Sequence, residues 1–550
     1  MGSASLNNPM VEQFLLYRYP WILEALLAAW AALICVNFST IVSALKPNVT
    51  KQGLAAAALI FGGALLIRLE IFPPRHQVYF DEFIHEDIAG NIARANAFGE
   101  TLIGGSDERR ELHAPAWPGG YHVLLGGLFK LTGTNEAAAS RFNAVMASAS
   151  VVLVFLLATV LFSDQWAGLL SALLLCALPV HIRFSATTDL TACSLFWILS
   201  ALLALALCFK QKSGPLLMLF LVTALYAANV RFENLILFPM AGMLFMSSPK
   251  QFPSMTNRQS VLGAVSVLLV LTPVIAVILL NRVNGMLGFD TPLSSVWLVL
   301  AQNIPANLRY LVGAPAVVLV PAIAAGLILA PKEDAAWARR LLIIGLGYLF
   351  LCALHSRGDF HTGTSERLSL PIFLSLILAA AAGFKAISER TKFRKIFSGA
   401  MLIAFILLNR SSYGQLPLER YEAEYRLVKE TAGRLPPGAY VLTYCAPLIM
   451  TLTKNPAVSA LLIPSGSGAL LDEFDQEEKN PLILFKDVWW YKLSERSAPL
   501  ERELQRRYNI EPLRTETIDS KEYGFYLLTR KTSGGAPPTS GTGRRRRTGA

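Results

Sequence analysis

The most constraining feature of this sequence is a series of apolar runs, most of them near the length that a helix needs to cross a bilayer. A transmembrane helix takes about 20 predominantly apolar residues, and such runs recur between residues 20 and 409. The chain has 550 residues, of which 53% are hydrophobic and only 16% are charged. Soluble proteins carry roughly a quarter charged residues. The sequence therefore predicts a polytopic α-helical membrane protein.

The apolar runs predict about twelve membrane spans. These are expected at residues 20–45, 53–72, 141–162, 166–184, 191–209, 215–230, 235–248, 260–280, 308–330, 341–355, 367–384 and 396–409. Lysines and arginines gather in loops that alternate with less basic ones, at residues 46–51, 210–212, 250–258, 332–340 and 385–395. Because basic loops of membrane proteins face the cytoplasm, we expect the other loops, the N-terminus and the chain after residue 410 on the extracytoplasmic side.

One short apolar run, residues 119–132, does not fit this alternation if it is counted as a span. As a span, it would also place Asp81 and Asp189 on opposite sides of the membrane. We therefore expect an amphipathic helix that lies at the membrane surface.

The chain is expected to have four segments. Residues 1–52 hold an extra first span, and residues 53–410 form the transmembrane core with a large first loop at 73–140. Residues 411–530 are more polar, and helical patterns at 418–434 and 500–508 alternate there with short apolar runs. These strand-like runs lie at residues 439–444, 482–485 and 524–528. The pattern predicts a small extracytoplasmic α/β domain, and the basic tail 531–550 is expected to be disordered.

Composition also argues against several classes of function. The six cysteines are scattered without a Cys-x-x-Cys pair, so neither a disulfide framework nor a zinc site is expected. The net charge of +11 is explained by basic cytoplasmic loops and the tail, not by nucleic-acid binding. We find no Walker or Gly-x-Gly-x-x-Gly phosphate loop. No ligand spacing requires a metal, and a divalent cation is left open as a cofactor.

The most unusual charged stretch is Val78–Arg94, which follows an apolar span directly. It carries four carboxylates and a histidine. Asp81 and His85 stand four residues apart, so on a helix they share one face. Acidic side chains beside a membrane are costly unless they are solvated, paired or used in function. A solvated helix with charged faces is the alternative interpretation.

More charged residues fall on the same expected side of the membrane. They are His113, His122, Arg141, Asp189, Arg231, Glu233, His355, His361, Glu366 and Arg367. Taken singly, each suits a structural role, such as a simple pair between Arg231 and Glu233. Together they combine carboxylates, which can act as general bases, with arginines, whose forked side chains bind phosphate. This combination at a membrane surface fits transfer from a lipid-linked phosphate donor.

The order of these motifs resembles the C-type membrane glycosyltransferases, in particular the protein O-mannosyltransferases and the aminoarabinose transferases of lipid A. The resemblance covers roughly residues 53–385. Its motifs are Tyr79-x-Asp-Glu82, His113-x-Pro115, Arg141 at the start of a span, Asp189 after a Phe-Ser turn, Arg231-x-Glu233, and Glu366-Arg367-x-x-x-Pro371. Three features depart from the family pattern, namely the extra span at 20–45, the His-Ala-Pro sequence and Arg231. They leave the acceptor open.

The resemblance implies a C-type glycosyltransferase-like bundle that uses a sugar carried on polyprenyl phosphate. It implies that Asp81 is the catalytic base, with Glu82 and Asp189 as further catalytic residues. Donor-phosphate binding is expected from Arg367, Arg231 and Arg141. Acceptor-binding or site-lining roles are expected for His85, His113, Glu233 and His361. Because a base must be ionised, we expect a cationic neighbour beside Asp81, with Arg141 or Arg231 as candidates.

The expected function is therefore a membrane glycosyltransferase of the bacterial inner membrane, acting on the extracytoplasmic side. Its partners would be the lipid-linked sugar, membrane lipid and an acceptor hydroxyl of a lipid, glycan or protein. One alternative is a transporter or flippase of lipid-linked sugars, which predicts charges near the bilayer midplane. The other is a non-catalytic membrane scaffold.

Overall fold

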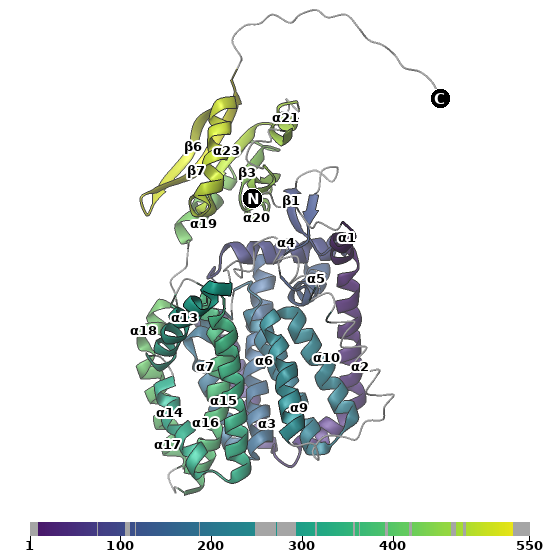
Figure 1. Cartoon of the computed structure of the whole chain (residues 1–550), viewed down its shortest axis with the longest axis vertical. Helices are drawn as coiled ribbons and strands as arrows, with labels where there is room; N and C mark the ends of the chain where they lie inside the picture. Colours follow the sequence, from purple (N-terminus) through teal and green to yellow (C-terminus); the bar gives the residue numbers. More distant parts are fainter. Residues whose placement is uncertain are drawn as a thin grey trace, which may run out of the picture. The chain divides into compact units, whose positions relative to one another are not determined.

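The computed structural model describes residues 9–73, 75–104, 111–115, 117–185, 187–247, 271, 275, 293–313, 316–355, 358–361, 364–390, 394–416, 421–463, 469–476 and 480–531. The chain divides into two compact units, which are described separately (Figure 1). The first unit contains the chain up to residue 101 together with residues 112–422. The second contains residues 102–111 and the chain from residue 423 onward.

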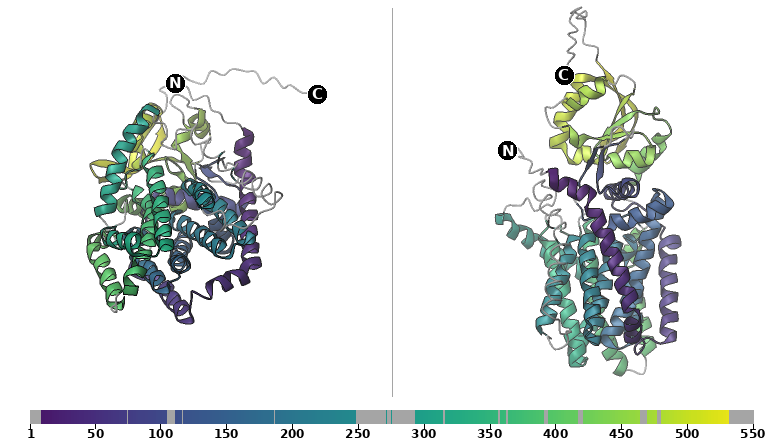
Figure 2. Two further views of the ribbon diagram at one scale, coloured as in Figure 1. Left: turned by 60° about the horizontal axis from the view of Figure 1, so that its bottom comes forward. Right: turned by 90° about the vertical axis from the view of Figure 1, so that its right-hand side faces the viewer.

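The first unit is built mainly from helices, many of which run side by side (Figure 2). They are α1 (Pro9–Tyr17), α2 (Tyr19–Leu45), α3 (Lys51–Leu66), η1 (Ile67–Ile71), α4 (Phe80–Ala95), α5 (Gly120–Thr132), α6 (Glu136–Phe162), α7 (Gln165–Ala177), α8 (Pro179–Arg183), α9 (Thr191–Gln211), α10 (Gly214–Val230), η2 (Phe232–Ile236), α11 (Leu237–Ser247), α13 (Leu293–Gly313), α14 (Ala316–Leu329), α15 (Lys332–Ala353), η4 (Ser365–Ser369), α16 (Leu370–Arg390), α17 (Arg394–Leu408) and α18 (Arg410–Gln415).

Six helices of the described chain are long and apolar enough to cross a membrane. They are Tyr19–Leu45, Lys51–Ile71, Glu136–Phe162, Thr191–Gln211, Lys332–Ala353 and Ser365–Arg390. These confirm a multi-pass helical membrane protein. The expected single span at 308–330 is instead divided, because Val296–Gly313 and Val317–Leu329 meet at an angle of 92°. The expected span at 260–280 lies outside the described residues except for 271 and 275, so the number of spans stays a prediction.

Helix α9 lies between α6 and α10 and is buried along most of its length (Figure 1). Its Trp197 is 1% exposed and packs against Trp30 of α2 and Tyr226 of α10, with ring centroids 4.9 and 4.2 Å away. The extra first span is therefore packed against the core helices. Helix α16 packs against α14 and α15 in the same way.

Helix α5 occupies the short apolar run that was expected to form a surface helix. It has 13 residues, fewer than the about 20 that a span requires. One face is buried, including Tyr121 and His122, and this face packs against α4. The structure thus confirms a short helix here, while its location at the membrane surface stays a prediction.

A mixed sheet with strand order β2-β1-β4-β3-β5-β7-β6 lies mainly in the second unit. Its strands are β1 (Glu100–Gly104), β2 (Glu111–His113), β3 (Tyr440–Thr443), β4 (Ala457–Ser459), β5 (Leu482–Lys486), β6 (Tyr508–Ile518) and β7 (Lys521–Arg530). Strand β3 is parallel to β4 and β5, whereas β7 is antiparallel to β5 and β6. The helices of this part are α19 (Glu422–Ala432), α20 (Ala446–Thr453), η5 (Ala460–Leu462), α21 (Ala469–Gln476), α22 (Val488–Lys492) and α23 (Ser494–Arg507).

The three strand-like runs expected after residue 410 are strands β3, β5 and β7. The sequence pattern missed β6, an edge strand with mostly exposed or half-exposed residues, because such a strand lacks the apolar signal of a buried one. It also missed that part of the first loop joins this sheet. Ile103 of β1 pairs with Val458 of β4.

The contact between α14 and α16 provides a test of the packing. A Cβ at Gly383 would lie 1.7 Å from the backbone oxygen of Ala322. Gly383→Ala should therefore push the helices apart and lower the stability of the purified protein by about 1–3 kcal/mol. Gly399→Ala is the matched control, since a Cβ there meets nothing within 4 Å and alanine favours a helix. Equal melting temperatures for both variants would contradict this packing.

Candidate functional site

The start of α4 is fixed by Glu82, which lies beside Asp81 in the sequence. One carboxylate oxygen of Glu82 accepts backbone N–H groups from Gln77, Val78 and Tyr79 at 2.9, 2.7 and 3.2 Å. Tyr79 has a φ of 58°, a strained conformation for a residue with a side chain. Glu82 was expected to be catalytic, but in this structure its buried carboxylate shapes the loop that presents Asp81.

His76 holds the other oxygen of Glu82. Its Nδ1 lies 2.9 Å from Glu82, and its Nε2 lies 3.1 Å from Glu136 at the start of α6. Burial disfavours the charged imidazole, but the two carboxylates raise the pKa of His76 well above its usual value. The resulting ion pairs tie the first loop to α6.

Asp87 and Asn91, which lie further along α4, bind the chain segment that follows the helix. The carboxylate of Asp87 accepts hydrogen bonds from the backbone N–H of Thr101 at 2.7 Å and from its hydroxyl at 3.0 Å. The amide of Asn91 donates to the carbonyl of Gly99 at 2.7 Å. With both ends fixed, α4 holds Asp81 in its first turn, where the side chain is 24% exposed.

The centre of the site is an arginine shared by two carboxylates from distant parts of the chain. One nitrogen of Arg367, Nη2, lies 3.0 Å from Oδ2 of Asp81, and the other, Nη1, lies 2.7 Å from Oδ1 of Asp189. Arg367 belongs to the short helix η4, and Asp189 lies two residues before the start of α9. The cationic neighbour of Asp81 is therefore Arg367, which corrects the expectation of Arg141 or Arg231.

Asp189 is held more firmly than Asp81. Its side chain is 1% exposed, and its second oxygen accepts hydrogen bonds from the backbone N–H, at 3.0 Å, and the hydroxyl of Thr191. Asn143 of α6 donates to the backbone carbonyl of Asp189 at 2.7 Å. Burial opposes ionisation, yet Arg367 and then Arg231 hold the pKa of Asp189 below its usual value.

Thr191 connects this centre to a second ion pair. Its hydroxyl oxygen accepts a hydrogen bond from Arg231 at 3.3 Å, and Arg231 contacts Glu233 at 3.0 Å. These contacts make an alternating charge network, defined as Asp81, Arg367, Asp189, Arg231 and Glu233 with Thr191 as the link. Its members come from α4, η4, the chain before α9, and the junction of α10 with η2.

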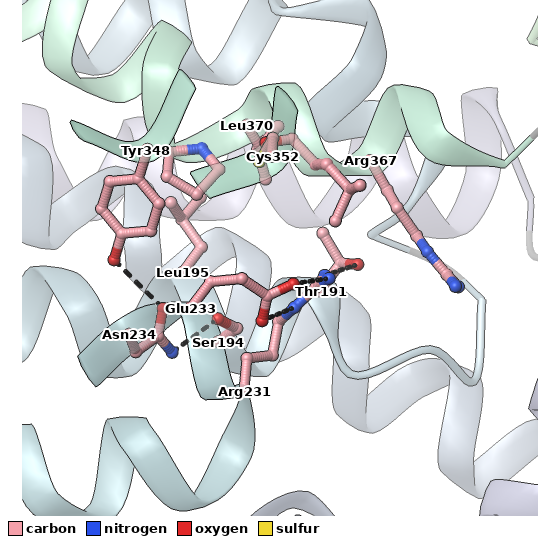
Figure 3. Close-up of a pocket in the computed structure, with 12 residues that line it drawn as sticks. Thr191, Ser194, Leu195, Arg231, Glu233, Asn234, Tyr348, Cys352, Arg367 and Leu370 are labelled. Atoms are coloured by element: carbon pink, nitrogen blue, oxygen red, sulfur yellow. Dashed lines mark hydrogen bonds and ion pairs between the residues drawn. The ribbon is translucent and has the colours of Figure 1, made fainter. Parts of the chain in front are cut away.

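A small pocket lies beside this network. Its residues are Thr191, Ser194, Leu195, Arg231, Glu233, Asn234, Tyr348, Cys352, Arg367, Leu368, Leu370 and Pro371. Figure 3 shows the Arg231–Glu233 pair between Arg367 and the hydrogen-bonded Asn234 and Tyr348. Two arginines and a set of mainly apolar side chains are thus among the residues that line this pocket.

Glu366, which is adjacent to Arg367 in the sequence, is held by two other residues. Its two oxygens accept hydrogen bonds from Arg183 of α8 at 2.5 Å and from the hydroxyl of Tyr310 at 3.0 Å. These contacts fix η4 and so orient Arg367. No sequence pattern singled out Arg183 or Tyr310, since an arginine in a short helix and a tyrosine in an apolar helix are common.

His85 lies one helical turn after Asp81 and bonds to His122 of α5, with 2.9 Å between Nδ1 and Nε2. His122 Nδ1 lies 3.2 Å from the carbonyl of Pro118, which can only accept, so we assign His122 as the donor there. His85 then donates through Nδ1 and keeps an unprotonated Nε2. Burial lowers the pKa of His85, which keeps it neutral in the field of the network.

Three expected site residues make no contact with the network in the described part of the chain. Arg141 is exposed on α6. His113 bonds to Glu12 of α1 at 2.9 Å, and the exposed His361 lies 3.3 Å from Asp359. The described residues also contain no group of three or more His, Cys, Asp or Glu that could hold a metal ion. Between Asp81 and Asp189 the cationic group is the guanidinium of Arg367.

Comparison with known proteins gives a family match and several structural likenesses. The family model described as dolichyl-phosphate-mannose-protein mannosyltransferase matches residues 118–277. No curated protein sequence matches the chain. Among solved structures, the archaeal oligosaccharyltransferase AglB from Archaeoglobus fulgidus, in complex with an inhibitory peptide and a dolichol-phosphate, is similar with a TM-score of 0.54 and 11% identity. The match covers 89% of this chain and 75% of that one.

ArnT from Cupriavidus metallidurans is similar in two states. In its apo state the TM-score is 0.53 at 12% identity, covering 87% of this chain and 97% of that one. Bound to undecaprenyl phosphate, the TM-score is 0.51 at 11% identity, with 86% and 97% covered. At such low identities, these likenesses show a common fold.

The burial of Glu86 predicts that the stability of the folded protein depends on pH. Its side chain is 1% exposed, and burial raises the pKa of Glu86 to about 8. A raised pKa means that the folded state binds a proton more tightly than the unfolded chain. Protonation of Glu86 therefore stabilises the folded state, and this contribution to stability is complete at low pH. It is lost as pH rises from the ordinary value of 4.5 to about 8.

Glu86→Gln should remove this dependence. We expect its melting temperature, relative to the wild type, to rise as the pH is raised from 5 to 8 and to level off above that. Thermal unfolding of the purified protein over this pH range is the measurement. A constant difference between the two proteins would contradict the raised pKa.

Proposed function

We propose that this chain, whose fold is similar to those of AglB and ArnT, is a C-type membrane glycosyltransferase that transfers a sugar from a polyprenyl-phosphate carrier to an acceptor hydroxyl. The observation that carries the proposal is the Arg367 fork between Asp81 and Asp189, next to the pocket that it lines with Arg231. A general base, phosphate-binding arginines and an apolar wall are the groups that such a reaction needs.

The pocket supports an amphiphilic phosphate as the donor. Arginine forks suit phosphate oxygens, and Arg231 and Arg367 both line this space. Apolar side chains, among them Leu195, Leu368 and Pro371, offer contacts for a hydrocarbon chain next to the phosphate. AglB and ArnT, which have a similar fold, form complexes with a dolichol-phosphate and with undecaprenyl phosphate, which agrees with a donor of this class.

In the proposed reaction, Asp81 accepts the proton of the acceptor hydroxyl as the hydroxyl oxygen forms a bond to the anomeric carbon of the sugar. The bond between that carbon and the phosphate oxygen breaks, and its electron pair stays on the phosphate. Arg367 and Arg231 offset the charge that develops there, and such electrostatic stabilisation is usually the largest contribution to rate. Attack opposite the leaving group inverts the anomeric configuration.

The other residues of the site have supporting roles in this proposal. Glu82 and His76 hold the loop before Asp81, and Glu366 orients Arg367. We propose that the site and the second unit face the extracytoplasmic side of a bacterial inner membrane, as the basic loops indicate. The sugar and the acceptor are left open by the residues of the pocket.

A transporter of lipid-linked sugars fits these observations less well. Substrate sites of such proteins lie near the bilayer midplane on broken helices. Here Asp81 is in the first turn of α4, Asp189 precedes α9, and Arg231 follows α10. The network is therefore made from helix ends, as in an enzyme site at a membrane surface.

The general base provides the direct test. Asp81→Asn keeps the size of the side chain but cannot accept the proton, so turnover with saturating lipid-linked sugar should fall about a hundred- to ten-thousand-fold. Mass spectrometry of lipid-linked sugars that accumulate in a deletion strain identifies the donor for this assay. Glu70→Gln, which removes an exposed carboxylate in η1, is the matched control and should keep wild-type turnover.

Expression and melting temperature should be compared for all variants, so that loss of turnover is separated from loss of folding. If Asp81→Asn keeps more than about a tenth of wild-type turnover, the loss is too small for a removed general base. Asp189 would then be the next residue to test as the base. Normal transfer in the deletion strain would instead favour a scaffold.

A further inference from the structure

Building on the proposed function, we infer that the donor phosphate and Asp81 compete for the same arm of Arg367, whereas Asp189 is a positioning residue that holds the other arm. Donor binding then displaces Asp81 and releases the base for reaction. The base and the phosphate-binding group would thus be coupled through one guanidinium.

The two arms of Arg367 are bound very differently. Asp189 accepts from Nη1 at 2.7 Å, is 1% exposed and receives two further hydrogen bonds from Thr191. Asp81 accepts from Nη2 at 3.0 Å and is 24% exposed. Within the described residues, Arg367 is the one hydrogen-bond partner of the Asp81 side chain. An anion arriving at Arg367 can therefore replace Asp81 far more easily than Asp189.

A phosphate has a physical reason to make this exchange. It presents several oxygens to a guanidinium fork and binds through charge-assisted hydrogen bonds. Arg367 and Arg231 are both among the residues that line the pocket. Two anions on one nitrogen of Arg367 repel each other, so the more exposed carboxylate leaves.

The exchange has a chemical consequence for Asp81. While its oxygen accepts a hydrogen bond from Arg367, that lone pair is not available to the proton of an alcohol. After displacement, this oxygen can accept the proton of the acceptor hydroxyl. This coupling favours ordered binding, in which the donor enters before the acceptor reacts.

Binding of undecaprenyl phosphate without a sugar tests the competition and needs no turnover. The full chain is purified in lipid nanodiscs, and the dissociation constant is measured for the wild type and for Asp81→Asn. We expect Asp81→Asn to bind the lipid about two- to tenfold more tightly, the range expected when a partly exposed ion-pair partner stops competing. Asp81→Ser is a second variant without the carboxylate, and Asp81→Glu should show no tightening.

A double-mutant cycle separates competition from simple charge removal. In an Arg367→Ala background, Asp81→Asn should no longer change affinity, since the shared arm is gone. Equal tightening in both backgrounds would show a through-space charge effect and overturn the inference. Unchanged or weaker binding by both Asp81→Asn and Asp81→Ser would overturn it as well.

The same measurement separates failure of this inference from failure of the proposed function. If the wild type binds undecaprenyl phosphate but the Asp81 variants bind no more tightly, only the competition is wrong. If the wild type does not bind the lipid at all, the proposed donor class is wrong and the competition falls with it.

Discussion

The structure of the site depends on keeping several charges together where little water can reach them. Arg367 lies between Asp81 and Asp189, and a threonine hydroxyl extends the contacts to Arg231. Burying charge is costly, and removing one partner from a buried ion pair typically costs about 3–5 kcal/mol. The alternating order of charges offsets this cost. It also constrains the fold, because helix ends from distant parts of the chain must meet at one place for any of the charges to be paired.

Two reactive side chains of the network, Asp81 and Arg367, each have a sequence neighbour with a structural role. Glu82 caps the loop in front of α4 while Asp81 faces Arg367. Glu366 bonds to Arg183 and Tyr310 while Arg367 faces the carboxylates. Adjacent residues on a tight helical turn point in different directions, so one can be anchored while the other is presented. This division explains why two charged pairs, Asp-Glu and Glu-Arg, occur at these places in the sequence.

Some parts of this structure can be predicted from the sequence more clearly than others. Apolar runs identify most helices because a membrane helix must be apolar over its whole length, and the order of motifs places Asp81, Asp189 and Arg367 on one expected side. Local sequence patterns do not predict which arginine contacts Asp81, because that depends on how the folded chain brings Arg367 to Asp81. Arg141 begins a long helix and looked equally suitable, yet its position on α6 leaves it exposed. The edge strand β6 and the joining of β1 to β4 were missed because tertiary pairing, not local pattern, decides them.

The sharing of Arg367 also bears on how the reaction would end. In the proposed step, Asp81 takes up the acceptor proton, so it is neutral at the moment when the phosphate is released from the sugar. A neutral carboxyl competes poorly for a guanidinium, and the phosphate therefore stays bound to Arg367 and Arg231 while Asp81 is protonated. Once Asp81 loses the proton to water, its carboxylate can return to Nη2 and help the phosphate to leave. One arginine held permanently by Asp189 can thus serve binding, base release and product release, because its second partner changes charge during the reaction.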